Sequence, residues 1–364
     1  MRIVLVGAAR PNFMKVAPVL RALEARGIEV TLVHTGQHYD DTMSGRFFRE
    51  LDIREPDVHL GAGSGTHADQ VGAVMRAFES VLVERRPDAV TVVGDVNSTL
   101  ACSLVAAQAS VPVAHVEAGL RSGDRRMPEE INRLCTDVLA DWLFTPSPDA
   151  DKNLLGEGVD PSRIFRVGNV MIDSLLQVAG RPDSGTLDRL GVKTASFVLA
   201  TLHRPATVDD ATRLEGVVGL LDRIATHEPV VFPAHPRTRR RLEEAGLVFS
   251  GDVTVTDPLG YVDFVNAMAS ASVVITDSGG VQEETTVLGV SCITLRDTTE
   301  RPITVEEGTN VVVGTDPRAA YAAYVAAPRE RRPYRPDLWD GRTGERIAEV
   351  LTTVPPPLAH ARRL

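Results

Sequence analysis

The chain has 364 residues, 43% of them apolar, which is enough to bury the cores of two ordinary domains. Its formal net charge of −10 excludes nucleic acid and anionic membranes as bulk partners, so local arginines, lysines and helix ends must hold any anionic ligand. No apolar run approaches the roughly 20 residues that span a bilayer, and no convincing signal-peptide cleavage site follows the first strand, so we expect a cytoplasmic protein.

Cys102, Cys135 and Cys292 stand singly inside apolar patterns, without the spacing of a metal site. We expect buried thiols in a reducing compartment and no catalytic cysteine. His34 and His38 lie four residues apart, but the strand-to-loop context denies them a common helical face. No metal site is predicted.

Apolar β-branched runs alternate with helical patterns in the first half of the chain. The predicted strands are residues 2–7, 29–34, 89–94 and 112–116. The helical stretches between them include Ala22 to Arg26 and Asn97 to Ala109. This alternation is typical of βαβ units, which build a doubly wound parallel sheet.

The turn after the first strand lacks the G-x-G-x-x-G fingerprint of dinucleotide-binding proteins, so bound NAD is not expected. Arg10 and Lys15 stand where this strand turns into a helix, and both could reach a phosphate or a sugar. Solvated charges at a helix start would explain them equally well.

Asp95, Glu117 and Glu129 follow the next two predicted strands. Ordinary roles exist for them, because Asp95 could cap the next helix, and Glu129 with Glu130 could complement a helix dipole. Ligands of parallel sheets, however, bind at the carboxyl ends of the strands. Mutual repulsion and partial burial there could raise a pKa enough for general acid or base work, so we expect proton transfer at this edge.

The strand pattern restarts after the turn-rich stretch 180–185, which is the expected boundary between lobes. The predicted strands of the second half are residues 197–202, 229–233, 252–256, 272–276 and 291–295. A last helix is expected near Arg342 to Thr352. The predicted fold class is α/β, with two doubly wound Rossmann-like lobes facing a cleft that holds the active site.

The second lobe carries the pattern of a nucleotide phosphate site. The strand at 272–276 breaks into Asp277-Ser278-Gly279-Gly280, and the helical stretch that follows directs free N–H groups and the positive end of its dipole at the turn. Arg301, after the next strand, can supply a cation for a diphosphate. His203 also follows a strand end, where a structural role and a ligand or proton role are equally plausible.

Taken together, these residues resemble the non-hydrolysing UDP-N-acetylglucosamine 2-epimerase family. The matching motifs, which cover nearly the whole chain, are Arg10-Pro11 with Lys15, Thr35 to His38, Gly94-Asp95, His115 to Arg121, Pro128 to Glu130 with Asn132-Arg133, Gly168-Asn169, His203-Arg204, Pro233 to Pro236, Asp277 to Glu284 and Arg296 to Pro302. The resemblance implies a fold of the glycosyltransferase-B type, commonly dimeric, with no metal or redox cofactor.

The resemblance also implies the reaction, a reversible C2 epimerisation of UDP-N-acetylglucosamine to UDP-N-acetylmannosamine. UDP would be eliminated to give a 2-acetamidoglucal and then added back, with Asp95, Glu117 and Glu129 as proton-handling groups and His203 supporting the diphosphate or leaving group. The expected partners are the UDP-sugar, UDP and a second copy of the chain.

The implied domains are residues 1–175, which carry the carboxylates, and 186–341, which bind UDP. The C-terminal helix, about 342–364, is expected to pack back on the first of these. By residue-wise comparison, the implied UDP contacts are Arg10, Phe264, Ser278, Gly279, Gly280, Glu284 and Arg301, with Phe264 near uracil and Glu284 on the ribose.

Two departures from the family pattern are visible. Many bacterial members continue the histidine motif as His-Arg-Arg-Glu-Asn, whereas this chain has Pro205-Ala206-Thr207 and lacks that carboxylate. Many also bind a second, activating UDP-N-acetylglucosamine through glutamines at positions where this chain has Asp40 and Gly65, although Gln37 and His235 match. We therefore expect weak or absent activation by substrate.

Four alternatives remain open. The chain could be a 2-epimerase of a related sugar such as a UDP-2,3-diacetamido-hexuronate, or a hydrolysing epimerase, which free N-acetylmannosamine among the products would reveal. It could also be a UDP-sugar glycosyltransferase, although three carboxylates suit proton removal better than transfer. A nucleotide-sugar binding protein without turnover would keep its function when Asp95 or Glu117 is replaced by the amide.

Overall fold

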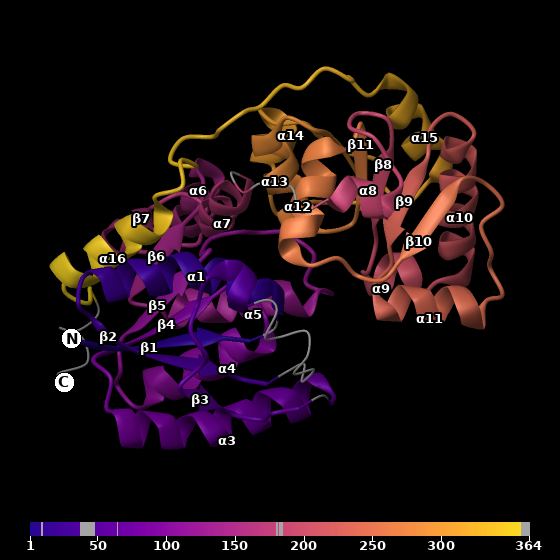
Figure 1. Cartoon of the computed structure of the whole chain (residues 1–364). Helices are drawn as coiled ribbons and strands as arrows, with labels where there is room; N and C mark the ends of the chain where they lie inside the picture. The colour runs from indigo at the N-terminus through magenta and orange to yellow at the C-terminus, as the bar shows by residue number, and fades with distance from the viewer. Residues whose placement is uncertain (9, 37–47, 64, 180, 182–184, 358–364) are drawn as a thin grey trace. The chain divides into compact units, whose positions relative to one another are not determined.

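The computed structural model describes residues 1–8, 10–36, 48–63, 65–179, 181 and 185–357 (Figure 1). The chain divides into two compact units. Unit 1 comprises Met1–Leu176 and Asp337–Leu364, and unit 2 comprises Gln177–Pro336. Each unit is built on one parallel sheet, so the predicted fold class of two parallel α/β lobes is confirmed.

Within the described residues, the sheet of unit 1 has seven strands in the order β3-β2-β1-β4-β5-β6-β7. Its central strands are apolar and fully buried, because helices cover both faces of a doubly wound parallel sheet. The strands are β1 (Arg2–Gly7), β2 (Glu29–His34), β3 (Val58–His59), β4 (Ala89–Val93), β5 (Val113–Val116), β6 (Trp142–Thr145) and β7 (Ile164–Arg166).

The helices of unit 1 alternate with the strands, as the βαβ crossovers of a parallel sheet require. Sequence signals set several of their starts: Thr66 and Asp69 form a capping box at one helix, and prolines occupy the first turn of two others. The helices are α1 (Arg10–Ala25), α3 (His67–Arg85), α4 (Asn97–Gln108), α5 (Pro128–Leu139), α6 (Pro148–Gly156), α7 (Val170–Ala179) and α16 (Thr343–Thr353), with a 3₁₀ turn at Pro161–Arg163.

Unit 2 has a six-stranded parallel sheet among its described residues, in the order β10-β9-β8-β11-β12-β13. Its strands are β8 (Val198–Thr201), β9 (Val230–Pro233), β10 (Val253–Thr256), β11 (Val273–Thr276), β12 (Ser291–Thr294) and β13 (Asn310–Val312). Its helices are α8 (Thr186–Leu190), α9 (Pro205–Val208), α10 (Ala211–Ala225), α11 (Pro236–Glu244), α12 (Tyr261–Ser270), α13 (Gly279–Leu288), α14 (Ile303–Glu306) and α15 (Pro317–Ala326).

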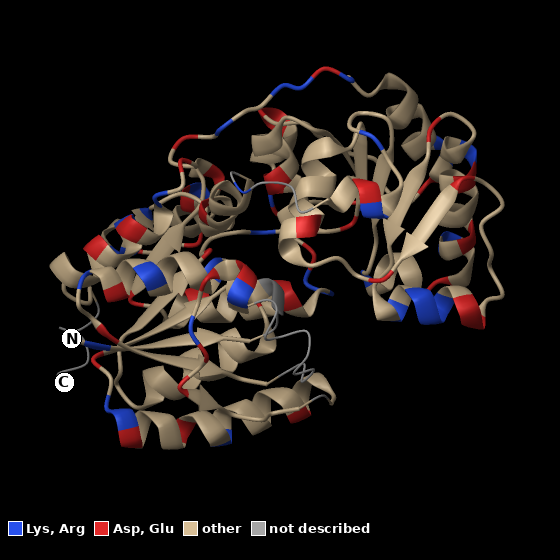
Figure 2. Ribbon diagram, viewed as in Figure 1, with Lys and Arg blue, Asp and Glu red and all other residues tan. Residues whose placement is uncertain are grey.

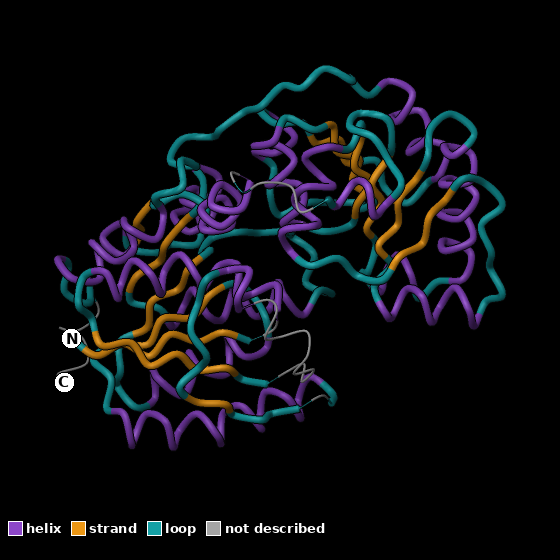
Figure 3. Tube along the Cα trace, in the orientation of Figure 1, coloured by secondary structure: helices purple, strands orange, loops and turns teal. Residues whose placement is uncertain are grey.

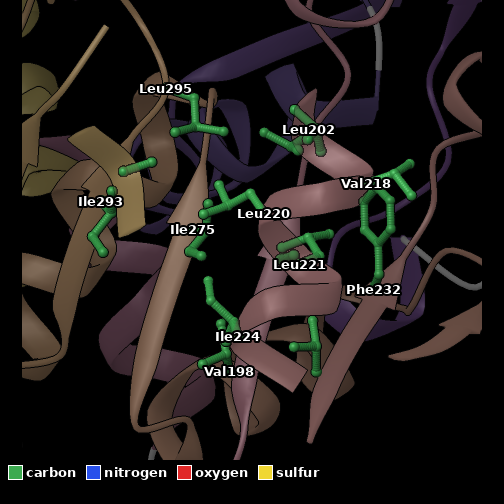
Figure 4. Close-up of a cluster of buried hydrophobic side chains, with 14 of the residues drawn as sticks. Val198, Leu202, Val218, Leu220, Leu221, Ile224, Phe232, Ile275, Ile293 and Leu295 are labelled. Atoms are coloured by element: carbon green, nitrogen blue, oxygen red, sulfur yellow. The ribbon is translucent and has the colours of Figure 1, made fainter. Parts of the chain in front are cut away.

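The core of unit 2 lies between the sheet and helix α10. Val218, Leu221 and Ile224 of α10 point toward Phe232 of β9 and Ile275 of β11, and all five are buried (Figure 4). The i, i+3 and i+6 spacing on α10 places its three side chains on one apolar stripe. This packing fixes β8 and β11, whose carboxyl ends carry the motifs discussed below.

All nine predicted strands are present, with ends within one residue of those expected. The strand pattern does not predict β3, β6, β7 or β13, which have only two to four residues. In runs of two or three residues, as in β3, β7 and β13, neither a period nor a β-branched bias separates a strand from a loop.

The chain leaves unit 2 after α15 and returns to unit 1 through the irregular segment 327–342, drawn in teal (Figure 3). In unit 1 the Trp339 indole is 1% exposed and donates a hydrogen bond to the Pro146 carbonyl at 2.9 Å. The first turn of α16 donates from Gly344 N to Asp173 Oδ2 at 2.8 Å. The C-terminal segment is therefore part of the core of unit 1.

Replacing Trp339 with alanine is expected to destabilise unit 1 by about 3–5 kcal/mol, because it leaves a cavity and an unpaired Pro146 carbonyl. Denaturant unfolding followed by circular dichroism measures the change. Trp339→Phe is the matched variant: it retains most of the ring and loses the hydrogen bond, so its loss should be clearly smaller. Equal losses of stability in Trp339→Ala and Trp339→Phe would mean that packing of the ring contributes little to the stability of unit 1.

The expectation that all three cysteines are buried is only partly confirmed. Cys102 and Cys292 are buried as expected, but Cys135 is exposed, so the expectation of a buried thiol there is wrong. Cys135 lies on α5, whose buried face is polar, which leaves its apolar residues outside.

Among the described residues, no helix is long and apolar enough to cross a membrane.

Candidate active site

Helix α5 presents a polar face to the interior of unit 1. Five of its residues are buried, and all five are polar: Glu130, Asn132, Arg133, Thr136 and Asp137. Buried charged groups require partners, and these partners come from the turns after β4 and β5. The helix therefore acts as the support for those two turns.

Asp95 follows β4 and forms an ion pair with Nη1 of Arg133, whose side chain is 1% exposed. The amide of Asn132 donates to the Asp95 carbonyl at 2.9 Å. The alternative role of Asp95 as a helix cap is wrong, because α4 begins at Asn97 behind Val96 and has no side-chain cap. Both the carboxylate and the backbone of Asp95 are instead fixed by α5.

Glu117 follows β5 in the left-handed backbone region, with φ of +70°. This conformation is strained for a residue other than glycine, and such strain is typical of functional positions. Its Oε2 forms an ion pair with Lys15, and the carboxylate is 4% exposed. Its Oε1 is buried and has no hydrogen-bond partner among the described residues.

Gly94 lies beside this carboxylate with φ of +74°. A Cβ at Gly94 would lie 3.5 Å from Glu117 Oε2 and 3.5 Å from Lys15 Nζ. Asn12 supports the same turn, since its amide donates to the Val93 carbonyl at 2.8 Å. The end of β4 is therefore packed directly against the ion pair of Glu117 and Lys15.

Glu130 and Glu129 differ although they are neighbours. Glu130 is buried, and it accepts hydrogen bonds from the backbone N–H groups of Ser122 and Gly123 and pairs with Arg133 at 2.5 Å. Burial raises the pKa of Glu130, but these donors outweigh it and hold the pKa below its usual range. Glu129 is half-buried and makes no hydrogen bond or ion pair within the described residues. Glu130 is therefore structural, whereas Glu129 keeps an open carboxylate.

The expected mutual repulsion of three carboxylates is not what the described residues show. Asp95 faces Arg133, and Glu117 faces Lys15, so a cation accompanies each of these carboxylates. Arg10 begins α1, but its side chain lies outside the part that the structure describes.

In unit 2, Asp277 follows β11 and is completely buried. It accepts hydrogen bonds from the backbone N–H groups of His203 and Arg204 at 3.0 and 2.8 Å, and its Oδ1 lies 3.2 Å from His203 Nδ1. Burial raises the pKa of Asp277, but these contacts outweigh it and hold the pKa below its usual range. Asp277 thus orients a half-exposed imidazole through its Nδ1.

Helix α13 begins at Gly279, and its N-cap Ser278 makes no side-chain cap. The N–H of Ser278 donates to Thr276 Oγ1 at 2.9 Å, so the first free N–H groups belong to Gly279 and Gly280. A Cβ on Gly279 would lie 2.4 Å from Arg301 Nη1 and 2.8 Å from Glu300 Oε1. Glycine is thus required where the helix start meets a buried ion-pair cluster.

Arg301 belongs to that cluster, because its Nε lies 2.8 Å from Glu283 Oε1 and its Nη1 pairs with Glu300. Arg296 lies 2.6 Å and Arg204 lies 3.6 Å from the same Glu300 carboxylate. Burial raises the pKa of Glu300, but the three arginines hold it well below its usual range. The carboxylates of Glu300 and Glu283 thus lie among three guanidinium groups beside the start of α13.

Glu284 lies further along α13, buried, and accepts a hydrogen bond from the Tyr261 hydroxyl at 2.9 Å. Burial raises the pKa of Glu284 to about 8, against the hydrogen bond from Tyr261 and with help from Glu283. Phe264 is half-buried one turn after Tyr261 on α12, so the two rings stand on the same side of that helix.

Replacing Glu284 with glutamine is expected to raise stability more at pH 8 than at pH 5. The folded pKa of about 8 exceeds the ordinary 4.5, so ionisation costs the wild-type fold stability between these two values, by roughly 1.4 kcal/mol per pH unit while only the unfolded chain is ionised. Glutamine does not titrate. Thermal unfolding of both proteins from pH 5 to 9 measures this, and a stability difference independent of pH would contradict it.

The residues invoked for substrate activation are only partly described. Gln37 and Asp40 lie outside the described residues, and Gly65 stands before the capping box of α3. His235 is the N-cap of α11, where its Nδ1 accepts a hydrogen bond from Arg237 N at 3.2 Å. Helix α11 is the most basic helix of unit 2 (Figure 2), with arginines at 237, 239, 240 and 241 that pair with neighbouring carboxylates.

Two groups near these sites do not follow from residue type and spacing alone. Arg133 and Asp277 are completely or almost completely buried and organise the residues around them. In the sequence, only their place in a motif marks these two residues. Arg133 follows Glu129 by four residues, and Asp277 directly precedes Ser278. No group of three or more potential metal ligands is found in the described part of the chain.

Comparison with known proteins assigns the chain to a family model. Residues 21–352 match the model described as UDP-N-acetylglucosamine 2-epimerase. The chain is 40% identical over 362 residues to a UDP-N-acetylglucosamine 2-epimerase of Methanocaldococcus jannaschii, covering 97% of this chain and 99% of that protein. It is 44% identical over 319 residues to a UDP-2,3-diacetamido-2,3-dideoxy-D-glucuronate 2-epimerase of Pseudomonas aeruginosa, covering 86% and 88%.

A solved structure shows the same fold. The crystal structure of the Methanocaldococcus jannaschii UDP-GlcNAc 2-epimerase in complex with UDP-GlcNAc and UDP has a TM-score of 0.90 to this chain, at 40% identity, and covers 97% of this chain and 99% of that one. The similarity extends through both units, so it includes the residues around Asp95 and Glu117 in unit 1 and the ion-pair cluster around Glu300 in unit 2.

Proposed function

The chain belongs to the UDP-N-acetylglucosamine 2-epimerase family, and from this membership we propose that it interconverts UDP-N-acetylglucosamine and UDP-N-acetylmannosamine. The observation that carries the proposal is the full-length similarity to an epimerase whose crystal structure holds UDP-GlcNAc and UDP. The carboxylates of unit 1 and the glycine-rich helix start of unit 2 fit the chemistry that such a substrate needs.

The proposed reaction avoids direct removal of a weakly acidic proton. No carbonyl adjoins C2 of the sugar, so an enolate cannot stabilise the carbanion. Breaking the C1–O bond as a base takes the C2 proton gives a 2-acetamidoglucal and UDP. Protonation of C2 on the opposite face with return of UDP to C1 gives the epimer. The reaction is balanced without water, which distinguishes it from a hydrolysing epimerase that would release free sugar.

Glu117 is the proposed base, because its Oε1 is buried without a partner in the described chain while Lys15 holds Oε2. Glu129, whose carboxylate makes no described ion pair, is the proposed proton-handling group of the other face. Asp95, which is fixed by Arg133, is the third carboxylate of the proposed site. Measuring the turnover of separate variants of the three carboxylates would show which proton transfer each one performs.

Unit 2 is proposed to hold the leaving group. The free N–H groups of Gly279 and Gly280 would bind the diphosphate at the positive end of α13. The arginines around Glu300 add positive charge beneath this turn, and His203 would support the oxygen that leaves C1. Glu284 would receive the ribose hydroxyls, and Phe264 would face uracil.

A second candidate is the 2-epimerisation of UDP-2,3-diacetamido-2,3-dideoxy-D-glucuronate, favoured by the 44% identity to the Pseudomonas aeruginosa protein. The two substrates differ at C3 and C6, so both functions use the same proton chemistry at C2. Measuring kcat/KM for each sugar separates them. At least a tenfold preference for UDP-N-acetylglucosamine supports the first proposal, and the reverse preference supports the second.

A further inference from the structure

His115 lies in β5, two residues before Glu117, and has no exposed surface. Its Nε2 lies 2.9 Å from the carbonyl oxygen of Gly94, and its Nδ1 lies 2.6 Å from Asp137 Oδ1. A carbonyl oxygen only accepts hydrogen bonds, so Nε2 carries a proton. The state of Nδ1 depends on Asp137.

Asp137 is an ionised acceptor. The N–H of Gly119 donates to its Oδ2 at 3.1 Å, and Nη2 of Arg121 lies 2.7 Å from the same oxygen. Burial raises the pKa of Asp137, but His115 and Arg121 outweigh it and hold the pKa below its usual range. Nδ1 of His115 thus lies against a buried, ionised carboxylate. With both ring nitrogens engaged and no surface exposed, the ring does not contact a substrate.

The ring is nevertheless linked to the proposed reacting groups through a single residue. Its acceptor, Gly94, adjoins Asp95 in the chain and packs against the ion pair of Glu117 and Lys15, as the 3.5 Å positions of a Cβ there show. Asp137 also holds Gly119, so the turns after β4 and β5 are both tied to one buried carboxylate. A shift of the His115 ring would therefore move Gly94, against which the Glu117 carboxylate packs.

We propose that His115 is a positioning residue whose buried ring, held by Asp137, sets the Gly94 turn and so the geometry of Asp95 and Glu117. The proposal rests on the proposed function, because those carboxylates matter only if protons are moved at C2. We expect the pair to contribute to the chemical step far more than to nucleotide affinity, since all the proposed UDP contacts except Arg10 lie in unit 2.

The test compares His115→Gln, Asp137→Asn and the double variant in the full chain, after wild-type turnover of UDP-N-acetylglucosamine is established. Each single variant is expected to lower kcat by about 10²-fold, as sub-ångström to ångström misplacement of catalytic groups does, with KM and the UDP dissociation constant within about threefold of wild type. Since the two residues act as one unit, the double variant should be no more than about threefold worse than the poorer single variant. His227→Gln, an exposed histidine that contacts Tyr321, is the matched control.

A folded His115→Gln enzyme with wild-type kcat would overturn the proposal, and so would single effects that multiply in the double variant. A measurement on the wild type covers the case in which the variants do not fold. Nitrogen-15 NMR of the histidine rings should show a proton on Nε2 of His115 that exchanges slowly with solvent, as a buried hydrogen bond to the Gly94 carbonyl requires. An absent or rapidly exchanging Nε2 proton at this position would contradict the proposal. An inactive wild-type protein with that protected proton would refute the proposed function alone.

Discussion

Glu117→Gln is expected to lower turnover by about 10³-fold or more while leaving UDP affinity within about threefold of wild type. The amide keeps the shape of the side chain but cannot accept the C2 proton, and general base catalysis at such a position contributes about 10²–10⁴-fold. The amide also cannot form the ion pair that the Glu117 carboxylate makes with the half-buried Lys15. Both effects act on the chemical step.

The measurement for Glu117→Gln is kcat with UDP-N-acetylglucosamine, together with calorimetric titration of UDP. Glu79→Gln, at an exposed position on α3, is the matched control and should retain wild-type turnover. If Glu117→Gln kept more than a tenth of the wild-type kcat, Glu117 would not be the base. Loss of UDP binding together with turnover would instead indicate a general failure of the fold.

Gly279→Ala is expected to weaken UDP binding by about 10- to 100-fold. A Cβ there would lie 2.4 Å from Arg301 Nη1 and 2.8 Å from Glu300 Oε1, and both side chains are buried, so the helix start must move. Movement of the first turn of α13 misdirects N–H groups that bind phosphate, and hydrogen bonds to charged groups contribute about 1.5–3 kcal/mol each.

Gly219→Ala is the matched control for Gly279→Ala, because a Cβ at Gly219 of α10 meets nothing within 4 Å. Alanine should stabilise that helix slightly and leave UDP affinity unchanged. Titration calorimetry with UDP, and thermal unfolding of both variants, separate binding from stability. Unaltered UDP affinity in a folded Gly279→Ala protein would show that α13 does not hold the diphosphate.

The sequence was sufficient to place nine of the thirteen strands of the described residues and the turns that follow those nine. Runs such as Phe197 to Leu202 and Ser272 to Thr276 are apolar, β-branched and bounded by polar turns, and in a parallel sheet their carboxyl ends share one edge. For this reason the positions of Asp95, Glu117 and Ser278 at strand ends could be predicted. Their partners could not.

Helix α5 shows why these partners could not be predicted from the sequence. Hydrophobic periodicity orients a helix only when its buried face is apolar, whereas α5 buries Glu130, Arg133 and Asp137 and leaves Val138 71% exposed. Glu129 and Glu130 look alike in sequence, and only the packed structure shows that Glu130 holds the 122–123 turn. The ion pairs of Asp95 and Glu117 are likewise long-range contacts that no local pattern encodes.

The most direct test of the account is incubation of the protein with UDP-N-acetylglucosamine in D2O, followed by proton NMR of C2 and of the products. The account predicts UDP-N-acetylmannosamine with deuterium at C2, deuterium entering the recovered substrate, and no accumulation of free N-acetylmannosamine. A folded protein that binds UDP yet gives neither exchange nor epimer would contradict it, and epimer formed without deuterium at C2 would exclude proton removal as the mechanism.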